Sequence, residues 1–395
     1  MMIIPNTRQC WCGNTDLLTF SNDYSQCSSC GTLVSLKGLE SEKLQVLDDE
    51  TDFYGKKYWL EHQSQDLDFP DIHKRSRNDL TERNLHWLKT LLKYCLPPAK
   101  TLELGCSHGS FVALLNQAGY DASGVEMSPW VIEFGQKTFG VPISVGPIEA
   151  LDIAPGSLDV IALMDVLEHL PDPVATMAQC LKLLKSDGLL LIQMPQFKEG
   201  MNYTTLVETK GAFLEQLKSD EHLYLFTDHS ATRLFQQLGA EHIQFEPAIF
   251  GHYDMFFAVS RTPLQANTPK QIESALLSTP KGRLALALMD IYDRELAAVA
   301  QLQADKAHLI AQLQISEADR SARLVVIESQ GQQLGRIPQL EAENIKHTNQ
   351  LQNYKTDNTH LVAQLQICEA ERAALYANKW VQMGIKTKLI ATKKP

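Results

Sequence analysis

The chain has 395 residues, of which 44% are hydrophobic and 21% are charged. This length exceeds that of a usual single domain and predicts two or three units. The net charge of -11 argues against general nucleic-acid binding, because attraction to phosphate requires a cationic surface. No apolar run reaches the roughly 18 residues of a membrane-spanning helix, and the N-terminus lacks the apolar core of a signal peptide. We therefore expect a cytoplasmic protein.

Four of the eight cysteines crowd into a turn-rich segment, residues 1–36. They lie in two turns, Cys-Trp-Cys-Gly (10–13) and Cys-Ser-Ser-Cys-Gly (27–31). Four thiolates on two turns suit a tetrahedral Zn²⁺ ion with a closed, structural role. The second turn resembles that of a zinc ribbon, whereas the first has one residue between its cysteines where a ribbon normally has two. The sequence predicts a zinc-ribbon-like module whose metal ligands are Cys10, Cys12, Cys27 and Cys30.

Residues 37–97 carry aromatic and charged side chains and are expected to form an N-terminal helical cap. Within them, Leu85, Leu88 and Leu92 recur at helical spacing, which predicts a helix over 78–96. The following pair of prolines ends this helix.

Residues 98–262 alternate short apolar runs with amphipathic stretches, a pattern typical of repeated strand–helix units. We expect an α/β fold, with a mostly parallel sheet and helices on both faces. The expected strands are 101–104, 121–125, 158–164, 189–193, 243–245 and 253–259, and the expected helices are 110–118, 130–139, 174–184 and 230–238.

The first expected strand runs into a glycine-rich turn, Gly-Cys-Ser-His-Gly (105–109), and then into a helix. Gly105 and Gly109 can adopt positive φ and let a bulky ligand approach the backbone. The second strand ends in Glu126, whose carboxylate can accept hydrogen bonds from both hydroxyls of a ribose. Open α/β sheets bind ligands at these carboxyl ends of strands, so the sequence predicts a nucleoside cofactor here.

Two classes of cofactor fit such a carboxylate. The dinucleotide fingerprint Gly-x-Gly-x-x-Gly places a second glycine where a pyrophosphate approaches a helix. Here three residues separate the two glycines, and S-adenosylmethionine (SAM) has no phosphate that would require the fingerprint. The segment Met-Asp-Val-Leu-Glu-His-Leu-Pro-Asp-Pro (164–173), at the end of the fourth strand, also favours SAM.

Four segments resemble, in order, the successive motifs of class I SAM-dependent methyltransferases. They are Leu-Glu-Leu-Gly-Cys-Ser-His-Gly (102–109), Gly-Val-Glu-Met-Ser (124–128), Leu-Asp-Val-Ile-Ala-Leu-Met-Asp-Val-Leu-Glu-His-Leu (158–170) and Asp-Gly-Leu-Leu-Leu-Ile-Gln-Met-Pro (187–195). The resemblance extends over roughly residues 99–260. It implies a Rossmann-like methyltransferase sheet, SAM as cofactor and methyl transfer as the activity. The alternative is an α/β domain whose glycine turn is only structural.

The resemblance also implies a role for each matching residue. The residues around the turn adjoin the methionyl part of SAM, and Glu126 holds the ribose. Met127 and Glu149 lie beside the adenine, and Asp165 opens the loop beneath the cofactor. Cys106 stands where many members have glycine. The implied cofactor-binding residues are Glu103, Gly105, Cys106, Gly109, Glu126, Met127, Glu149 and Asp165.

Transfer from the sulfonium of SAM requires mainly that an acceptor nucleophile is aligned with the carbon–sulfur bond. A hydroxyl acceptor also has to lose its proton, a task to which histidine is suited near neutral pH. His222, in Glu-His-Leu-Tyr-Leu-Phe-Thr (221–227), resembles the segment that borders the acceptor pocket in relatives and is the favoured base. His169 is the alternative, and either ring could instead only pack its loop.

The acceptor is less constrained than the cofactor. Related methyltransferases that act on sugars carry a similar zinc module, so we expect O-methylation of a sugar or a cell-surface glycan, as in polysaccharide biosynthesis. C-methylation of a nucleotide-linked sugar and O-methylation of a quinone-like small molecule are the alternatives. A third alternative is a scaffold with an inactive methyltransferase domain, against which Gly105, Gly109 and Glu126 argue.

The last third of the chain differs in composition. Residues 263–283 combine prolines with little apolar pattern and are expected to be a linker. In residues 284–383, apolar side chains recur at three- and four-residue steps and the segment 308–315 returns at 360–367. This predicts a coiled coil, interrupted at Pro338, that makes a homo-oligomer; a lone solvated helix is the alternative. The basic tail, 384–395, fits a frayed helix end or weak contact with an anionic membrane surface.

Overall fold

The computed structural model describes residues 8–37, 46–65, 70–333 and 337–377. The chain divides into two units, one that ends at Met289 and one over Asp290–Gln382. No helix among the described residues is long and apolar enough to cross a bilayer. The expected basic tail lies outside the described residues.

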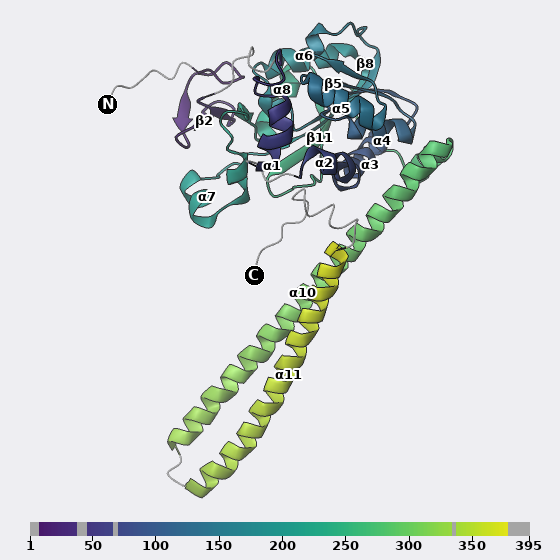
Figure 1. Cartoon of the computed structure of the whole chain (residues 1–395). Helices are drawn as coiled ribbons and strands as arrows, with labels where there is room; N and C mark the ends of the chain where they lie inside the picture. The colour runs from purple at the N-terminus through teal and green to yellow at the C-terminus, as the bar shows by residue number, and fades with distance from the viewer. Residues whose placement is uncertain (1–7, 38–45, 66–69, 334–336, 378–395) are drawn as a thin grey trace. The chain divides into compact units, whose positions relative to one another are not determined.

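A seven-stranded sheet forms the centre of the first unit, in the order β10-β11-β8-β7-β4-β5-β6. Figure 1 labels three of its strands, β5, β8 and β11. The strands from β8 to β6 are parallel, and β11 is antiparallel to both β8 and β10. In β7, Val160, Ile161, Ala162 and Leu163 are fully buried, so both faces of this strand are covered, as is usual in parallel sheets. The predicted α/β fold is confirmed. The strands are β4 (Lys100–Leu104), β5 (Asp121–Glu126), β6 (Ile143–Val145), β7 (Leu158–Met164), β8 (Leu184–Pro195), β10 (His242–Glu246) and β11 (Asp254–Ser260).

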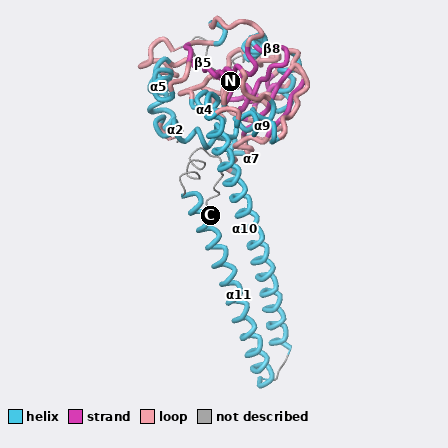
Figure 2. The backbone as a smooth tube through the Cα atoms, turned by 90° about the vertical axis from the view of Figure 1, so that its right-hand side faces the viewer, coloured by secondary structure: helices cyan, strands magenta, loops and turns pink. Residues whose placement is uncertain are grey.

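Helices fill the connections between these strands, and Figure 2 shows them on both sides of the strands. The predicted helices 110–118, 130–139, 174–184 and 230–238 agree with α4, α5, α6 and α8 to within two residues at each end. Glycines with positive φ, Gly109 and Gly119, flank α4, because glycine adopts this conformation without a Cβ clash. The helices and short helical turns are α4 (Ser110–Ala118), α5 (Pro129–Phe139), η4 (Ile148–Ala150), η5 (Leu167–His169), α6 (Pro173–Leu183), α7 (Tyr203–Thr209), η6 (Ala212–Gln216) and α8 (Asp228–Gln237).

The segment before the sheet is helical, as predicted, but its main helix is built in two parts. The predicted helix over 78–96 begins earlier, in α2, passes through a π-helical turn and continues as α3, which ends at Tyr94 because Cys95 is extended. Trp87, Leu88 and Leu91 of α3 are buried in the first unit. The elements of this segment are η2 (Tyr58–His62), α1 (Gln63–Gln65), α2 (Ile72–Asp79), η3 (Leu80–Asn84) and α3 (Leu85–Tyr94).

The N-terminal cysteine-rich segment shares a sheet with a later part of the chain. Strands β1 (Leu17–Thr19), β2 (Tyr24–Cys27) and β3 (Leu33–Ser35) are antiparallel, and β3 pairs with β9 (Tyr224–Leu225). In addition, the hydroxyl of Tyr24 donates to the carbonyl of His222 at 2.9 Å, and that of Ser35 donates to the carbonyl of Ser219 at 2.6 Å. The segment is therefore attached to residues 219–225, a contact that its own sequence did not indicate.

The prediction of a linker over 263–283 is wrong for part of this range. Helix α9 (Pro269–Leu277) occupies it, and α10 begins at Pro280. Thr268 and Gln271 form a capping box at the start of α9, a spacing that the sequence contains and that favours a helix start. The side-chain amide of Asn267 donates to the carbonyl of Leu92 at 3.0 Å and ties this segment to α3.

The second unit is a helical hairpin. Helices α10 (Pro280–Gln333) and α11 (Ile337–Ala377) run antiparallel (Figures 1 and 2), with a break before Pro338, as predicted. Lys306 pairs with Glu369 at 2.7 Å, and Arg323 donates to the hydroxyl of Tyr354 at 3.0 Å. The two halves of the expected coiled coil therefore pair within one chain.

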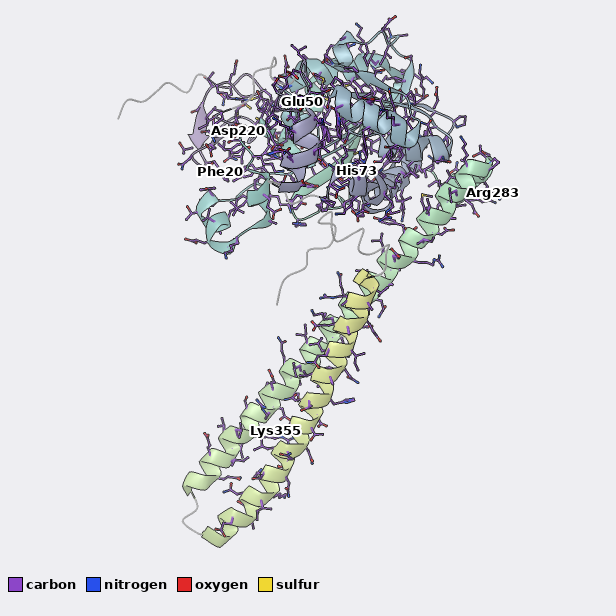
Figure 3. All side chains as sticks on the ribbon, in the orientation of Figure 1. Phe20, Glu50, His73, Asp220, Arg283 and Lys355 are labelled. Carbon is purple, nitrogen blue, oxygen red and sulfur yellow. The ribbon has the colours of Figure 1, made fainter. Side chains whose placement is uncertain are left out.

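The internal repeat has the same local structure in both helices. Within α10, Gln312 and His308 are hydrogen-bonded at 2.9 Å, and within α11, Gln364 and His360 are bonded at 3.1 Å. Because the hairpin is antiparallel and Lys306 faces Glu369, the two copies lie beside each other in opposite directions. Figure 3 shows the side chains of both helices, including Lys355 of α11.

The first turns of α10 contribute to the first unit, and this contribution can be measured. Ala285 and Met289 are buried, so a chain that ends after Met289 is expected to fold. A chain that ends after Arg283 loses both side chains, and burial of a methionine is worth roughly 1.5–3 kcal/mol. Thermal unfolding followed by circular dichroism should show a lower Tm for the shorter chain. Equal Tm values would contradict this role of α10.

Candidate functional site

The glycine-rich turn after β4 is held open by its glycines. Gly105 has a φ of 68°, and a Cβ there would lie 2.6 Å from Cγ2 of Val166, in the turn after β7. Gly109 has a φ of 75°, and a Cβ there would lie 2.9 Å from Cδ1 of Ile143. Any other residue at either position would be strained and would push the neighbouring connections apart.

Glu126, at the end of β5, ties this turn to the next strand. Its carboxylate accepts hydrogen bonds from the backbone N–H groups of Ser107 at 2.9 Å, Met127 at 2.7 Å and Ser128 at 3.3 Å. Burial raises the pKa of Glu126, although these three N–H groups oppose the rise. The side chain is therefore fixed at the strand tip beside the glycine turn, the place predicted for a ribose contact.

Glu103 is buried in β4 with one carboxylate oxygen that has no hydrogen-bond partner. Burial, and after it the charge of Glu126, raises the pKa of Glu103 well above its usual value. A buried carboxylate without a partner is costly, and the cationic amino group of a methionyl moiety would supply one. The bare turn and the unpaired carboxylate therefore fit SAM.

A cavity of about 650 Å³ opens beside this turn. Of the implied cofactor residues, Glu103, Gly105, Cys106 and Asp165 line it, whereas Gly109, Glu126, Met127 and Glu149 are outside its described lining. The exposed Glu149 accepts a hydrogen bond from the Thr176 hydroxyl at 2.8 Å, and its adenine contact stays a prediction.

Asp165, directly after β7, is one of the few residues other than glycine with positive φ, at 59°. Arg83 and the amide of Gln193 donate to its two carboxylate oxygens at 3.4 and 3.3 Å. The indole N–H of Trp87 in turn donates to the side-chain amide oxygen of Gln193 at 2.9 Å. This network orients Asp165 on the cavity wall. The sequence did not single out Arg83 or Gln193, because their contact with Asp165 depends on how η3 packs against the sheet.

The two histidines predicted as candidate bases come together on the wall of the same cavity. The rings of His169 and His222 have centroids 4.9 Å apart, and both line the cavity. Nδ1 of His169 lies 2.9 Å from the carbonyl oxygen of Glu221, and Nδ1 of His222 lies 2.8 Å from that of Gln216. Because a carbonyl only accepts, each Nδ1 carries a proton and donates. In the neutral rings, each Nε2 therefore has a free lone pair.

Two carboxylates surround these histidines, and they differ in their partners. Glu221 accepts hydrogen bonds from His62 at 3.1 Å and from the hydroxyl of Tyr58 at 3.3 Å. Glu168 is fully buried, and neither of its oxygens has a hydrogen-bond partner. Burial, and then the charge of Asp165, raises the pKa of Glu168 well above its usual value. Neither glutamate was predicted from the sequence as a site residue, although each directly precedes a candidate histidine.

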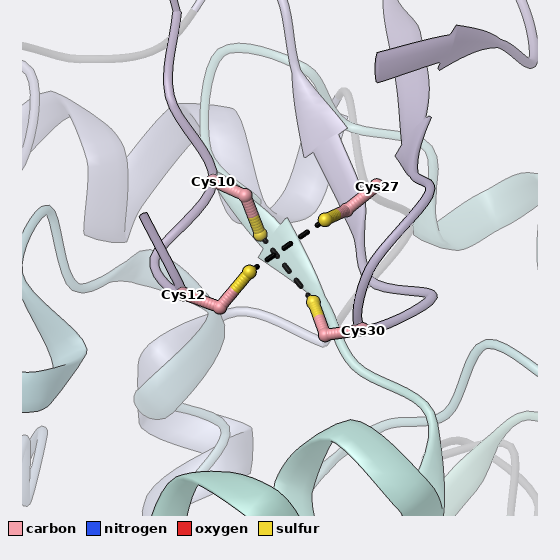
Figure 4. Close-up of side chains that lie close together, drawn as sticks. All are labelled: Cys10, Cys12, Cys27 and Cys30. Atoms are coloured by element: carbon pink, nitrogen blue, oxygen red, sulfur yellow. Dashed lines mark hydrogen bonds between the residues drawn. The ribbon is translucent and has the colours of Figure 1, made fainter. Parts of the chain in front are cut away.

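The four N-terminal thiols converge, as predicted (Figure 4). Sγ of Cys10 lies 3.5 Å from that of Cys30, and Sγ of Cys12 lies 3.6 Å from that of Cys27. A tetrahedral ion with bonds of about 2.3 Å separates its sulfur ligands by about 3.8 Å, so the spacing fits Zn²⁺. In each turn the N–H of the following glycine donates to the carbonyl of the first cysteine at 2.9 Å. The shorter first turn therefore presents its thiols as the second does.

Comparison with known proteins identifies the central domain. Residues 75–244 match a family model described as a methyltransferase domain. The chain is 28% identical over 130 residues to a ubiquinone biosynthesis O-methyltransferase of Methylococcus capsulatus, which covers 31% of this chain and 50% of that protein. It is 29% identical over 137 residues to the enzyme of that name from Xanthomonas campestris, which covers 33% of this chain and 53% of that protein. The chain thus spans about half the length of the curated relatives it matches.

A solved structure of a SAM-dependent methyltransferase from Thermotoga maritima, a possible histamine N-methyltransferase, is also similar. Its sequence identity is 18% and its TM-score is 0.37, over 48% of this chain and 96% of that one. The family match over residues 75–244, the strand order and the glycine-turn motif agree with one another. The chain therefore contains a class I SAM-dependent methyltransferase domain.

The role of Glu126 can be tested by calorimetry. Glu126→Ala removes the acceptor predicted for the ribose hydroxyls and is expected to weaken SAM binding by roughly 1–3 kcal/mol. Glu133→Ala, which removes an exposed carboxylate paired with Lys137 on α5, is the matched control and should bind SAM as the parent does. Unchanged affinity in Glu126→Ala would contradict the placement of the ribose.

Proposed function

We propose that the chain transfers a methyl group from SAM to an oxygen of a small hydroxylated acceptor. The observation that carries this proposal is that one cavity is lined both by Glu103 and Gly105 of the predicted cofactor site and by the histidines His169 and His222. The cavity size is typical of sites that bind small molecules. The names of the curated relatives, ubiquinone biosynthesis O-methyltransferases, support oxygen as the acceptor atom and a quinone-like acceptor.

Bound SAM supplies a methyl group that is already activated by its sulfonium. The acceptor oxygen uses a lone pair to form the new carbon–oxygen bond, and the electron pair of the broken carbon–sulfur bond stays on sulfur. The acceptor proton has to leave. We propose that His169 and His222 act on the acceptor hydroxyl, with His222 as the base favoured by its sequence context. Alignment of the acceptor with the methyl group is the main task of the cavity wall.

The acceptor that the sequence favoured, a sugar or glycan, and the alternative of C-methylation are decided by experiment. The expected sugar or glycan acceptor has no supporting observation in the structure or the relatives, and C-methylation has none either. The decisive measurement is transfer of labelled methyl from SAM into fractionated extract, followed by identification of the labelled product. A labelled methyl group bonded to a carbon atom of that product would contradict O-methylation. No heat of binding at millimolar SAM would favour the scaffold alternative.

We also propose that Cys10, Cys12, Cys27 and Cys30 hold a structural Zn²⁺ ion. The sulfur spacing described above supports it. Through the pairing of β3 with β9 and the bond from Tyr24 to the His222 carbonyl, the module supports the segment that carries His222. Zinc would therefore stabilise the position of His222 in the cavity wall without being in contact with the acceptor.

We propose further that the helical hairpin associates with a second copy. Apolar side chains remain exposed on it, among them Ile315 at 71%, Val325 at 64% and Ile345 at 64%. Apolar side chains exposed along paired helices are available for contact with another chain. Light scattering should then show that the chain truncated after Met289 is a monomer and that the full chain is a dimer or a larger oligomer. Equal oligomeric states of the two chains would contradict the proposal.

The role of His222 can be tested with the labelled-methyl assay. His222→Ala is expected to lower turnover by on the order of 10²-fold, the usual contribution of a group that handles a proton. His229→Ala changes an exposed histidine on α8 and should leave turnover unchanged. Equal turnover in both variants would move the role to His169 or to neither ring.

The zinc proposal predicts a loss of both metal and activity. Cys30→Ser removes one of four thiolate ligands and should reduce zinc, measured by mass spectrometry of the metal content, to well below one ion per chain. Turnover should fall with it, since β3 no longer supports β9. Cys95→Ser, at a partly buried thiol outside the cluster, should keep its zinc. Full zinc content in Cys30→Ser would disprove a four-cysteine site.

A further inference from the structure

A second group of ligand atoms lies inside the cavity, away from the cysteine cluster. The carboxylate of Glu168 and a ring nitrogen from each of His169 and His222 all lie within 4.8 Å of one another. Glu168 is fully buried and His222 is 5% exposed. The three residues come from two connections, η5 and the segment before β9, that pack together because the Leu223 N–H donates to the Glu168 carbonyl at 2.8 Å.

The hydrogen bonds around the two histidines leave the Nε2 atom of each ring free. Each histidine donates its Nδ1 proton to a backbone carbonyl, of Glu221 or of Gln216. This fixes the tautomer and directs the Nε2 lone pair away from the backbone. Metal-binding histidines are commonly held in this manner, with the second ring nitrogen bonded to a carbonyl or carboxylate.

Glu168 supplies the independent sign of a missing ligand. Both of its oxygens are buried, and neither has a hydrogen-bond partner, whereas the neighbouring Glu221 is paired with His62 and Tyr58. A cation or a donor placed in the cavity would satisfy Glu168, to whose oxygens no group of the described chain is hydrogen-bonded. Two neutral imidazoles beside it can accept such a cation but cannot donate through their free nitrogens.

We propose that Glu168, His169 and His222 bind a divalent transition-metal ion. Two imidazoles and one carboxylate form a set that such ions favour, and three protein ligands leave coordination positions open. The open positions face the cavity in which the acceptor is proposed to lie. The role of the ion rests on the proposed function, with His169 and His222 acting as ligands of the ion in place of a histidine base. The ion would hold the acceptor oxygen and make its proton easier to lose to water. An acceptor with two adjacent oxygens, such as a catechol or a vicinal diol, would fit best.

Lys218 is the residue that opposes this assignment. It lines the same cavity, and its positive charge acts on Glu168 and on both imidazoles. Repulsion from Lys218 should weaken ion binding without abolishing it, since one ammonium faces three ligands. Lys218→Met is therefore expected to tighten binding, and weaker binding in this variant would contradict the site.

Mn²⁺ titration of the full, zinc-loaded chain tests the proposal. Mn²⁺ prefers oxygen and nitrogen ligands to thiolates, so the cysteine cluster does not compete. Loss of the free-ion signal in electron paramagnetic resonance should report one bound Mn²⁺ per chain, and pulsed spectra should show nitrogen couplings from two imidazoles. Absence of binding at millimolar Mn²⁺ would overturn the inference.

Three variants locate the ion. Glu168→Gln keeps the shape of the side chain but removes its charge, and His222→Ala removes one nitrogen ligand. Each should weaken Mn²⁺ binding by about tenfold or more. Glu221→Gln, a buried neighbour whose carboxylate is outside the group, should bind Mn²⁺ as the parent does. Parent affinity in both Glu168→Gln and His222→Ala would overturn the site, and His222→Ala decides the question if Glu168→Gln does not fold.

Calorimetry with SAM on the same preparations separates this inference from the proposed function. SAM binding without Mn²⁺ binding would overturn the metal site and leave methyl transfer in place. Mn²⁺ binding without SAM binding would support the metal site and contradict the methyltransferase proposal.

Discussion

The parallel register of β4, β5 and β7 is the constraint on which the site depends. Parallel neighbours end at the same edge of a sheet, so the residues that follow each strand are brought together there. Gly105 follows β4 and leaves room for Val166, which follows β7. A Cβ at position 105 would lie only 2.6 Å from Cγ2 of Val166. Glu126 at the end of β5 accepts the N–H of Ser107 in the turn after β4. The three connections hold one another, and the cavity lies beside them.

The part of the cavity wall that contains His222 depends on a contact between segments far apart in the sequence. Strand β3 of the cysteine-rich segment pairs with β9, and Tyr24 bonds to the carbonyl of His222. A segment that reads as a separate module thus forms part of the support of this wall. Through this arrangement the proposed zinc site, which has no open coordination position, would influence the cavity, because β3 is the sole neighbour of the short strand β9 in the described sheet order.

Two buried glutamates on the cavity wall have carboxylate oxygens without a hydrogen-bond partner. Glu103 has one unpaired oxygen beside the glycine turn, and Glu168 has two beside the histidines. In both cases burial raises the pKa of the carboxyl well above its usual value. Leaving such groups unpaired destabilises the fold, and native structures tolerate this chiefly where a ligand completes the pairing. The proposed SAM amino group and the proposed metal ion are the cations that would do so.

The sequence alone determined the features that depend on neighbours along the chain. The strand and helix alternation, the glycine turn and the carboxylate at the tip of β5 were all predictable, because hydrophobic periodicity and glycine conformation are local properties. The convergence of the four cysteines was also predictable, since two short turns can meet in few ways. The capping box of α9 was present in the sequence but was outweighed by the prolines around it.

Tertiary structure decided what lies opposite what. His169 and His222 are far apart in the chain, and only the packing of η5 against the segment before β9 brings their rings to 4.9 Å. The lack of a partner for Glu168 is likewise invisible in the sequence, because it depends on everything that surrounds the side chain. The apolar pattern of α10 and α11 predicted pairing but not the partner, since the same stripe can pack against another chain or, after a turn, against its own continuation.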